Sequence, residues 1–141
     1  MFKLRTLNIV FTAVIVICFA ACSGSVTQKD SLSGGKWLLY ELDGSQYTAP
    51  SAGESVYIVF NAAASQTSGM ASCNTFSGEY TTTGSSIKIG PLISTKIACD
   101  DMKTEMKFMQ SLNKAVSYKI SSGSLSLMDD AGVVLCRLRL E

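Results

Sequence analysis

Apolar and polar side chains alternate along most of the chain after residue 35, and a two-residue period predicts β-strands. Residues 55–61 place three apolar side chains on one face, and residues 133–140 repeat the pattern with Arg137 and Arg139 on the polar face. The predicted strands are 36–43, 55–61, 69–80, 86–90, 117–121, 124–128 and 133–140. Most of the turns between them are short, which favours antiparallel pairing.

A different period appears between residues 101 and 116, where apolar side chains recur at steps of three and four. This spacing predicts an amphipathic helix. Asp100 or Asp101 can cap it, because a carboxylate accepts hydrogen bonds from the free N–H groups of a first turn. The helix must bury its apolar stripe against the sheet. The expected fold class is therefore α+β, a curved antiparallel β-sheet wrapped around one main α-helix.

Three methionines, Met102, Met106 and Met109, follow the apolar stripe of this predicted helix. We expect them to pack in the core, because the helix needs a face to bury. Methionine is also flexible and polarisable, which suits promiscuous binding surfaces. The alternative is therefore an apolar pocket between helix and sheet that takes an acyl chain or a small apolar ligand.

Residues 1–21 form a separate segment, basic at Lys3 and Arg5 and then apolar. The apolar run is shorter than the roughly 20 residues that span a bilayer as a helix, and small residues precede Cys22, as signal peptidases require. The segment resembles a bacterial lipobox and predicts a lipoprotein signal peptide over 1–21, with cleavage before Cys22 and acylation (such as palmitate) of Cys22. An ordinary transmembrane helix and a plain secretory signal are the rival interpretations.

Residues 22–35 carry few large apolar groups and predict a flexible linker, so a single domain over 36–141 remains. The chain has 12 basic and 11 acidic residues, and without Lys3 and Arg5 the 10 basic residues that remain nearly balance the 11 acidic ones. The charges are scattered and lack the basic footprint of a nucleic-acid-binding protein. We expect a membrane partner through the lipid and no nucleic acid. Ser23 after the acylated cysteine favours the outer membrane of the cell envelope, with the periplasmic or surface face left open.

The sequence contains no histidine. This excludes Ser-His-Asp and Cys-His catalysis and removes the commonest general base and metal ligand. Asp100, Asp101 and Glu105 form an acidic cluster, but its spacing does not match a calcium-binding EF-hand loop. Helix capping and turn formation explain these carboxylates. We therefore expect no catalytic residue, no metal and no cofactor, so that the protein is not an enzyme.

Four segments carry a more specific pattern. They are Trp37-x-Leu39 before Asp43-Gly44; Gly69-x-x-x-Cys73-Asn74-x-Phe76-x-Gly78-x-Tyr80; Thr95-x-x-Ala98-Cys99 before Phe108 and Leu112; and Leu125-x-Leu127-x-Asp129-x-x-Gly132. In this order they resemble the META/HslJ (DUF306) family of bacterial envelope lipoproteins, which implies a half-barrel-like sheet, a membrane tether and links to heat shock and novobiocin tolerance. The family supplies no catalytic residue. The motif residues expected to be structural are Trp37, Gly69, Asn74, Phe76, Gly78, Tyr80 and Thr95. Gly78 in mid-strand suggests a bulge or a close backbone approach.

Cys73 and Cys99 fall in the two most family-like motifs, and export to an oxidising compartment lets disulfides persist. The favoured hypothesis is a structural disulfide between them, while two separate buried thiols or a reactive pair remain open. Cys136 lies on the apolar face of its predicted strand and is expected to act as a small buried hydrophobe.

The leading functional hypothesis is a non-enzymatic, membrane-anchored envelope lipoprotein that binds a protein partner in stress or assembly. The first alternative is a module that binds an apolar small ligand or a lipid. The second is a thiol redox protein that uses Cys73 and Cys99.

Overall fold

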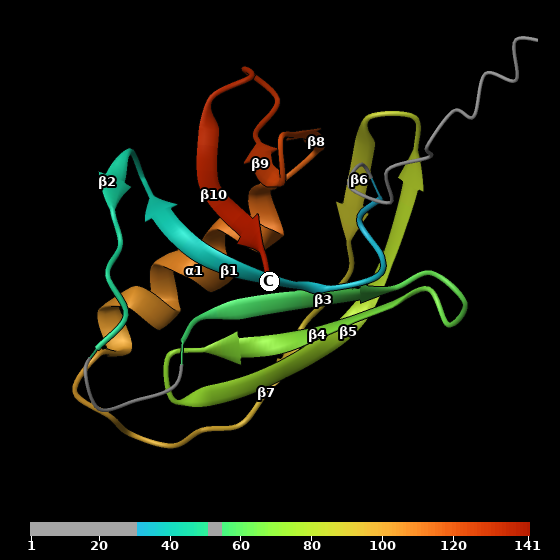
Figure 1. Ribbon diagram of the computed structural model, residues 1–141. Coiled ribbons are helices and arrows are strands. Elements are labelled where there is room, and N and C mark those ends of the chain that lie inside the picture. Colours follow the sequence, from blue (N-terminus) through green and yellow to red (C-terminus); the bar gives the residue numbers. More distant parts are fainter. Residues whose placement is uncertain (1–30, 51–54) are drawn as a thin grey trace, which may run out of the picture.

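The computed structural model describes residues 31–50 and 55–141. The predicted signal peptide, Cys22 and the linker up to residue 30 lie outside these residues. The elements are β1 (Lys36–Leu42), β2 (Ser45–Gln46), β3 (Tyr57–Asn61), β4 (Gln66–Ala71), β5 (Asn74–Thr83), β6 (Ser86–Ile89), β7 (Ile93–Ser94), α1 (Met102–Lys114), β8 (Ser117–Ser121), β9 (Ser124–Met128) and β10 (Val134–Leu140) (Figure 1). In this part of the chain, no helix has the length and apolar character that crossing a membrane requires.

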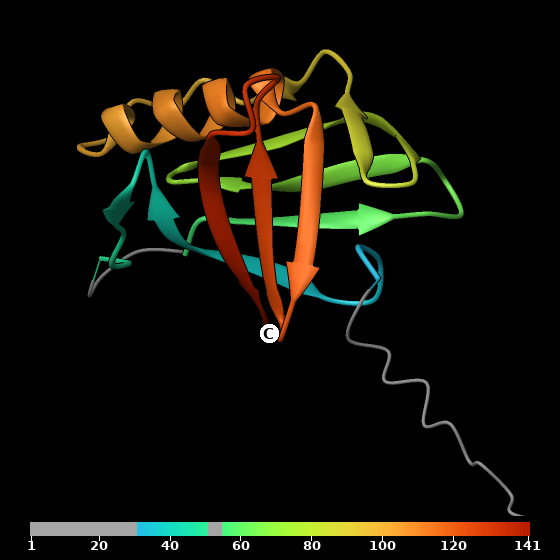
Figure 2. The same cartoon turned by 90° about the horizontal axis from the view of Figure 1, so that it is seen from above.

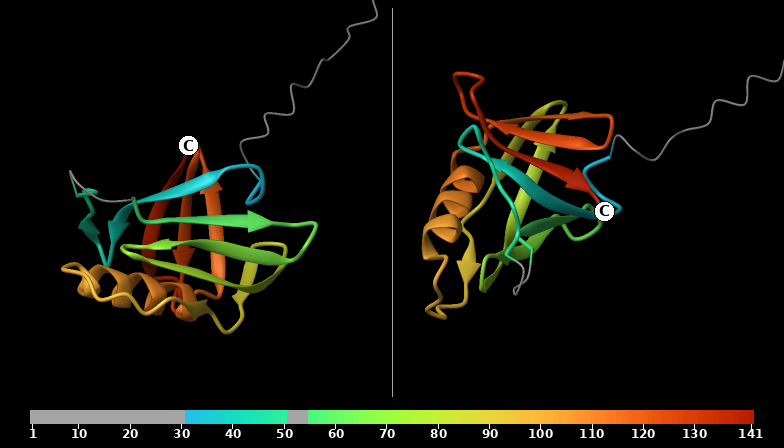
Figure 3. Two further views of the ribbon diagram at one scale, coloured as in Figure 1. Left: turned by 90° about the horizontal axis from the view of Figure 1, so that it is seen from below. Right: turned by 60° about the vertical axis from the view of Figure 1, so that its left-hand side comes forward.

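Eight strands form a closed antiparallel barrel in the order β1-β3-β4-β5-β6-β8-β9-β10. The ring closes because β10 pairs with β1, from Trp37 opposite Leu140 to Leu42 opposite Cys136. The two short strands attach at the side, β2 to β1 and β7 to β5. Figure 3 shows the ring from two further directions.

The expected fold class, a sheet wrapped around a main helix, is therefore wrong. The sheet wraps around its own side chains, because a barrel of about eight strands is just wide enough for them to fill its interior. Trp37, Phe60 and Leu138 are among the side chains with 0–2% exposure in this core. Helix α1 lies across one end of the barrel instead, where it contacts β4, β9 and β10 (Figure 2).

One long predicted strand, 69–80, is two strands in the structure. Strands β4 and β5 form a hairpin in which Gly69 lies opposite Phe76. The turn falls at Ser72, whose φ of 71° is unusual for a residue other than glycine. Neither glycine nor proline marks this turn in the sequence, so the pattern alone predicts one continuous strand.

Helix α1 is confirmed as an amphipathic helix, and Asp101 caps it by accepting a hydrogen bond from the Thr104 N–H at 3.3 Å. Its buried face consists of Phe108, Ser111 and Leu112. The core placement expected for the methionines is wrong for the first two of them, since 44% of Met102 and 67% of Met106 is exposed. Met109 is half-buried and packs against the core.

Candidate functional site

The most densely bonded polar side chain among the described residues is Asn74, which lies at the start of β5 and is buried. Its Nδ2 group donates to the Ile97 carbonyl at 2.9 Å and to Glu105 Oε2 at 2.8 Å. Its Oδ1 atom accepts from the Ile97 N–H and from Thr95 Oγ1, both at 2.7 Å. Both ends of the amide are thus satisfied, as burial of a polar group requires. Asn74 therefore joins the β4–β5 turn to the segment before α1 and to the first turn of α1.

The hypothesised disulfide is present, and it reinforces this junction. Cys73 and Cys99 are bonded across a sequence separation of 26 residues, with their Cα atoms 6.4 Å apart. The alternative of two separate buried thiols is excluded by this bond. We name Asn74, Thr95, Glu105 and the Cys73–Cys99 disulfide the clasp. The clasp holds residues 95–99 between the barrel and α1.

Two glycines of the family-like motif allow close packing beside the clasp. A Cβ atom on Gly69 would lie 2.1 Å from the Tyr57 carbonyl oxygen and 2.7 Å from the Phe76 ring. A Cβ atom on Gly78 would lie 2.8 Å from the Pro91 carbonyl oxygen, which is the close backbone approach suggested for Gly78. The Phe76 ring packs edge-on against Phe108 of α1, with centroids 6.1 Å apart. The motif thus seats the helix on the end of the barrel.

The remaining motif aromatics lie in the core. Tyr80 packs edge-on against Phe60 with a centroid distance of 4.9 Å. Trp37 is fully buried and donates its indole N–H to the Leu32 carbonyl at 2.8 Å. Contacts of the domain therefore extend back to Leu32.

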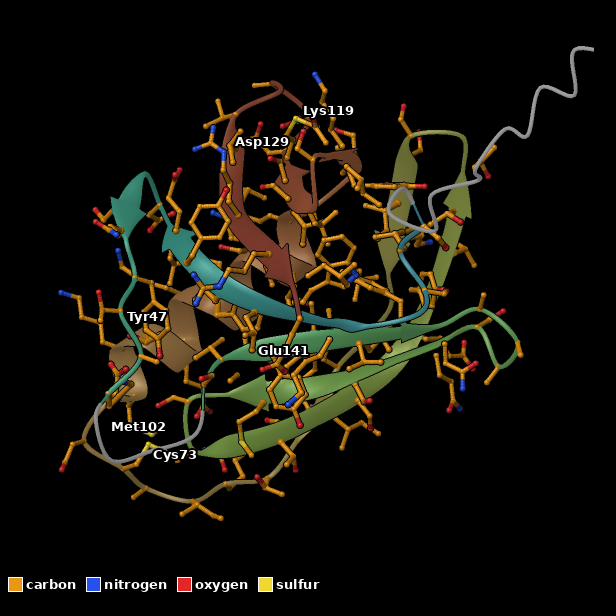
Figure 4. All side chains as sticks on the ribbon, in the orientation of Figure 1. Tyr47, Cys73, Met102, Lys119, Asp129 and Glu141 are labelled. Atoms are coloured by element: carbon orange, nitrogen blue, oxygen red, sulfur yellow. A yellow bond between two sulfur atoms is a disulfide. The ribbon has the colours of Figure 1, made fainter. Side chains whose placement is uncertain are left out.

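The solvent-facing side of α1 carries an apolar hollow of about 580 Å³, which we name the methionine groove. Its lining residues include Ser94, Met102, Glu105, Met106, Met109 and Gln110. Ile93 and Ile97, in the segment that precedes α1, have 78% and 58% of their area exposed. The clasp borders this groove, since Cys99 Sγ lies 4.0 Å from Met102 Sδ. Figure 4 shows Met102 and Cys73 at the same corner of the molecule.

The sequence identified the methionines and both cysteines as candidate functional residues, but it did not predict that they lie together at one corner of the molecule. Glu105, which the sequence placed in an acidic cluster explained by helix capping and turn formation, is the hydrogen-bond partner of buried Asn74. No sequence signal pairs these two residues, because they lie 31 positions apart. The helical spacing of Phe108, Leu112 and Ala115 marks one of the two apolar faces of α1, but it does not say which of the two is buried.

A second hollow, of about 630 Å³, lies over the outer face of β1 and is bounded by Tyr40, Tyr47 and Arg139. Its lining also includes Ser55, which adjoins residues outside the described ranges. Half-burial, and secondarily the charge of Asp101, raises the pKa of Tyr47 above its usual value, so its hydroxyl stays protonated at neutral pH. We therefore take the methionine groove, whose lining is fully described, as the candidate functional site.

Cys136 is the free cysteine of the described residues and is buried on the inner face of β10. Burial, with a smaller contribution from Asp43, raises the pKa of its thiol to about 12. A thiol with so high a pKa is inert at neutral pH, because the thiolate is the reactive form. Cys136 is thus the small buried hydrophobe that its strand pattern predicted.

These features define a class of small closed antiparallel barrels with one end covered by a helix. A family model described as the META domain matches residues 30–141, and the chain belongs to the META domain family. This family is not a known family of enzymes. No curated protein matches the sequence.

Solved structures with the same fold share little sequence with this chain. An NMR structure of a protein from Burkholderia xenovorans has 22% identity and a TM-score of 0.61, over 77% of this chain and 83% of that one. A crystal structure of a DUF4847 family protein from Bacteroides vulgatus has 16% identity and a TM-score of 0.57, over 77% and 93% of the two chains. At these identities the similarity is one of fold alone.

Proposed function

We propose that this META domain protein is a non-enzymatic, lipid-anchored protein of the cell envelope that binds another envelope protein through the methionine groove. The single observation that carries the proposal is the exposure of Met102 and Met106 on the outer face of α1. Grouped exposed apolar side chains are typical of interaction sites, and methionine adapts its shape to varied partners. A role in envelope stress or assembly fits such a binding protein.

The position of the groove supports a protein partner over the anchoring membrane. The start of the described chain, drawn in blue before β1, lies at the end of the barrel opposite α1 (Figure 2). Strand β1 then runs toward the helix, where Asp43 pairs with Lys107 of α1 at 2.9 Å. The groove thus lies at the end of the barrel away from the point where the tether joins, and a flexible linker from Cys22 would let it reach other envelope proteins.

A small apolar ligand is the second candidate, because the volume of the groove falls within the ~300–1,000 Å³ typical of ligand sites. The ligand would lie on the outer face of α1. The contact between helix and barrel, which is the alternative place predicted for such a ligand, is filled by Phe108 and Leu112, both fully buried.

Site-specific photo-crosslinking in intact cells tests the groove. A photoreactive amino acid replaces Met106 in the full-length protein, and a matched control replaces exposed Lys119, which lies far from Met102 (Figure 4). We expect one discrete protein adduct from position 106, none from position 119, and loss of the adduct when Met102→Glu is added. An adduct with the mass of a lipid or small molecule would favour the second candidate. Equal labelling from both positions would refute the groove as the binding site.

The anchor is tested separately by the intact mass of protein extracted from membranes. We expect a chain that begins at Cys22 and carries added acyl mass, whereas Cys22→Ser should leave the signal peptide uncut. An unprocessed wild-type chain would refute the lipoprotein part of the proposal and would leave the groove untouched.

A further inference from the structure

We propose that reduction of the Cys73–Cys99 disulfide turns the clasp into a binding site for Zn²⁺, with Cys73, Cys99 and Glu105 as the protein ligands. This inference does not depend on the partner of the methionine groove. It gives the reduced form of this cysteine pair a role of its own, which is to bind a metal ion.

The ligand atoms are already gathered. The two sulfur atoms and a carboxylate oxygen of Glu105 all lie within 4.8 Å of one another, and Cys73 Sγ is 3.9 Å from Glu105 Oε2. With Zn–S near 2.3 Å and Zn–O near 2.1 Å, neighbouring ligands of a tetrahedral site lie about 3.5–3.8 Å apart. Side-chain rotation after cleavage of the disulfide is enough to reach this spacing, since the two Cα atoms are only 6.4 Å apart.

The carboxylate is held in place by a group that does not depend on the disulfide. Asn74 Nδ2 donates to Glu105 Oε2 at 2.8 Å, and Asn74 is itself fixed by Thr95 Oγ1 and by the Ile97 N–H. Outer hydrogen bonds of this kind orient ligating carboxylates in metal sites. The buried amide therefore keeps Glu105 aimed at the two sulfur atoms in either redox state.

The chemistry needs an external dithiol. The dithiol attacks the disulfide, transfers two electrons and two protons to Cys73 and Cys99, and becomes a disulfide itself. Both cysteines are partly exposed, which gives the dithiol access. Zn²⁺ then replaces the two thiol protons, and two thiolates with one carboxylate leave one tetrahedral position for water.

Zinc is the cation that this donor set fits best. A carboxylate oxygen is an ordinary zinc ligand, whereas thiolate with thioether favours monovalent copper. Met102 Sδ lies 4.0 Å from Cys99 Sγ, so a thioether is available for comparison. The two metals would thus depend on different side chains, Glu105 for zinc and Met102 for copper.

The test is a zinc titration of the full chain in detergent against a chromophoric chelator, after dithiol reduction and anaerobic removal of the reductant. We expect one Zn²⁺ per reduced chain and none at this site in the oxidised chain. Glu105→Gln should weaken binding at least about tenfold, while Met102→Leu and the exposed control Glu79→Gln should leave it unchanged. Cys73→Ser with Cys99→Ser should abolish it.

Circular dichroism during the titration separates binding from folding. If the reduced chain loosens without metal, Zn²⁺ should restore the folded spectrum and raise the Tm of the wild type but not of Glu105→Gln. Zinc binding by the reduced wild type no tighter than by the double serine variant would overturn the proposal. Equal binding by wild type and Glu105→Gln, or dependence on Met102 instead, would overturn it as well.

Discussion

Replacement of Asn74 by alanine tests the clasp most sharply, because this one buried side chain makes four hydrogen bonds that hold the clasp together. Asn74→Ala removes two bonds donated by Nδ2, one of them to the Glu105 carboxylate, and two accepted by Oδ1. A neutral hydrogen bond contributes about 1 kcal/mol and one to a charged group about 1.5–3 kcal/mol.

Solvent exposure of the partners reduces the expected loss. Thr95 and Ile97 are exposed, so their freed polar groups can bind water, and Glu105 is partly exposed. We therefore expect Asn74→Ala to lower the free energy of unfolding by about 2–4 kcal/mol, which is less than the full sum of the bonds.

Urea unfolding of the oxidised protein, followed by circular dichroism, measures this loss. Asn61→Ala is the matched control, because Asn61 is exposed and its Oδ1 atom accepts a single local bond from the Ala64 N–H at 3.2 Å. The control should cost about 0.5–1 kcal/mol or less. The reasoning is refuted if Asn74→Ala costs no more than Asn61→Ala.

Three further results are expected. Gly69→Ala should cost about 3 kcal/mol or more, since its Cβ atom would lie 2.1 Å from a backbone oxygen. Gly132→Ala, at φ 77° in open space, should cost about 1–2 kcal/mol; similar Tm losses for both would contradict the packing argument. Cys73→Ser with Cys99→Ser should lower the free energy of unfolding by roughly 3 kcal/mol through the closed loop, and an unchanged urea midpoint would contradict a structural role. The folded state keeps the Cys136 proton to about pH 12, whereas the unfolded thiol loses it near pH 8.5–9. Stability should therefore be full below about pH 9 and fall above it, by on the order of 1 kcal/mol per pH unit; an equal alkaline loss in Cys136→Ala would refute this.

The sequence predicted the local structure better than the closure of the sheet. The inward faces of residues 55–61 and 133–140 are correct, because alternation records burial residue by residue. Pairing of β1 with β10 joins the two ends of the domain, and no local pattern encodes such a contact. When that pairing is unknown, the predicted helix is the element left to cover the apolar face of the sheet, and this leads to the incorrect fold class.

The methionines show a second limit. A helix with apolar residues on two adjacent faces gives two possible orientations, and the pattern alone does not choose between them. Phe108 and Leu112 take the buried face because they fill the end of the barrel beside Phe76. Met102 and Met106 are then left at the surface, where the sequence did not place them.

The central claim is that a partner protein covers the methionine groove in the envelope, and methionine oxidation tests it most directly. Brief peroxide treatment followed by peptide mass spectrometry gives the rate of sulfoxide formation at each methionine. The account predicts fast oxidation of Met106 and Met102 in the purified protein and severalfold protection of both in intact cells, with half-buried Met128 slow in each case. Equal oxidation of Met106 in purified protein and in cells would contradict it.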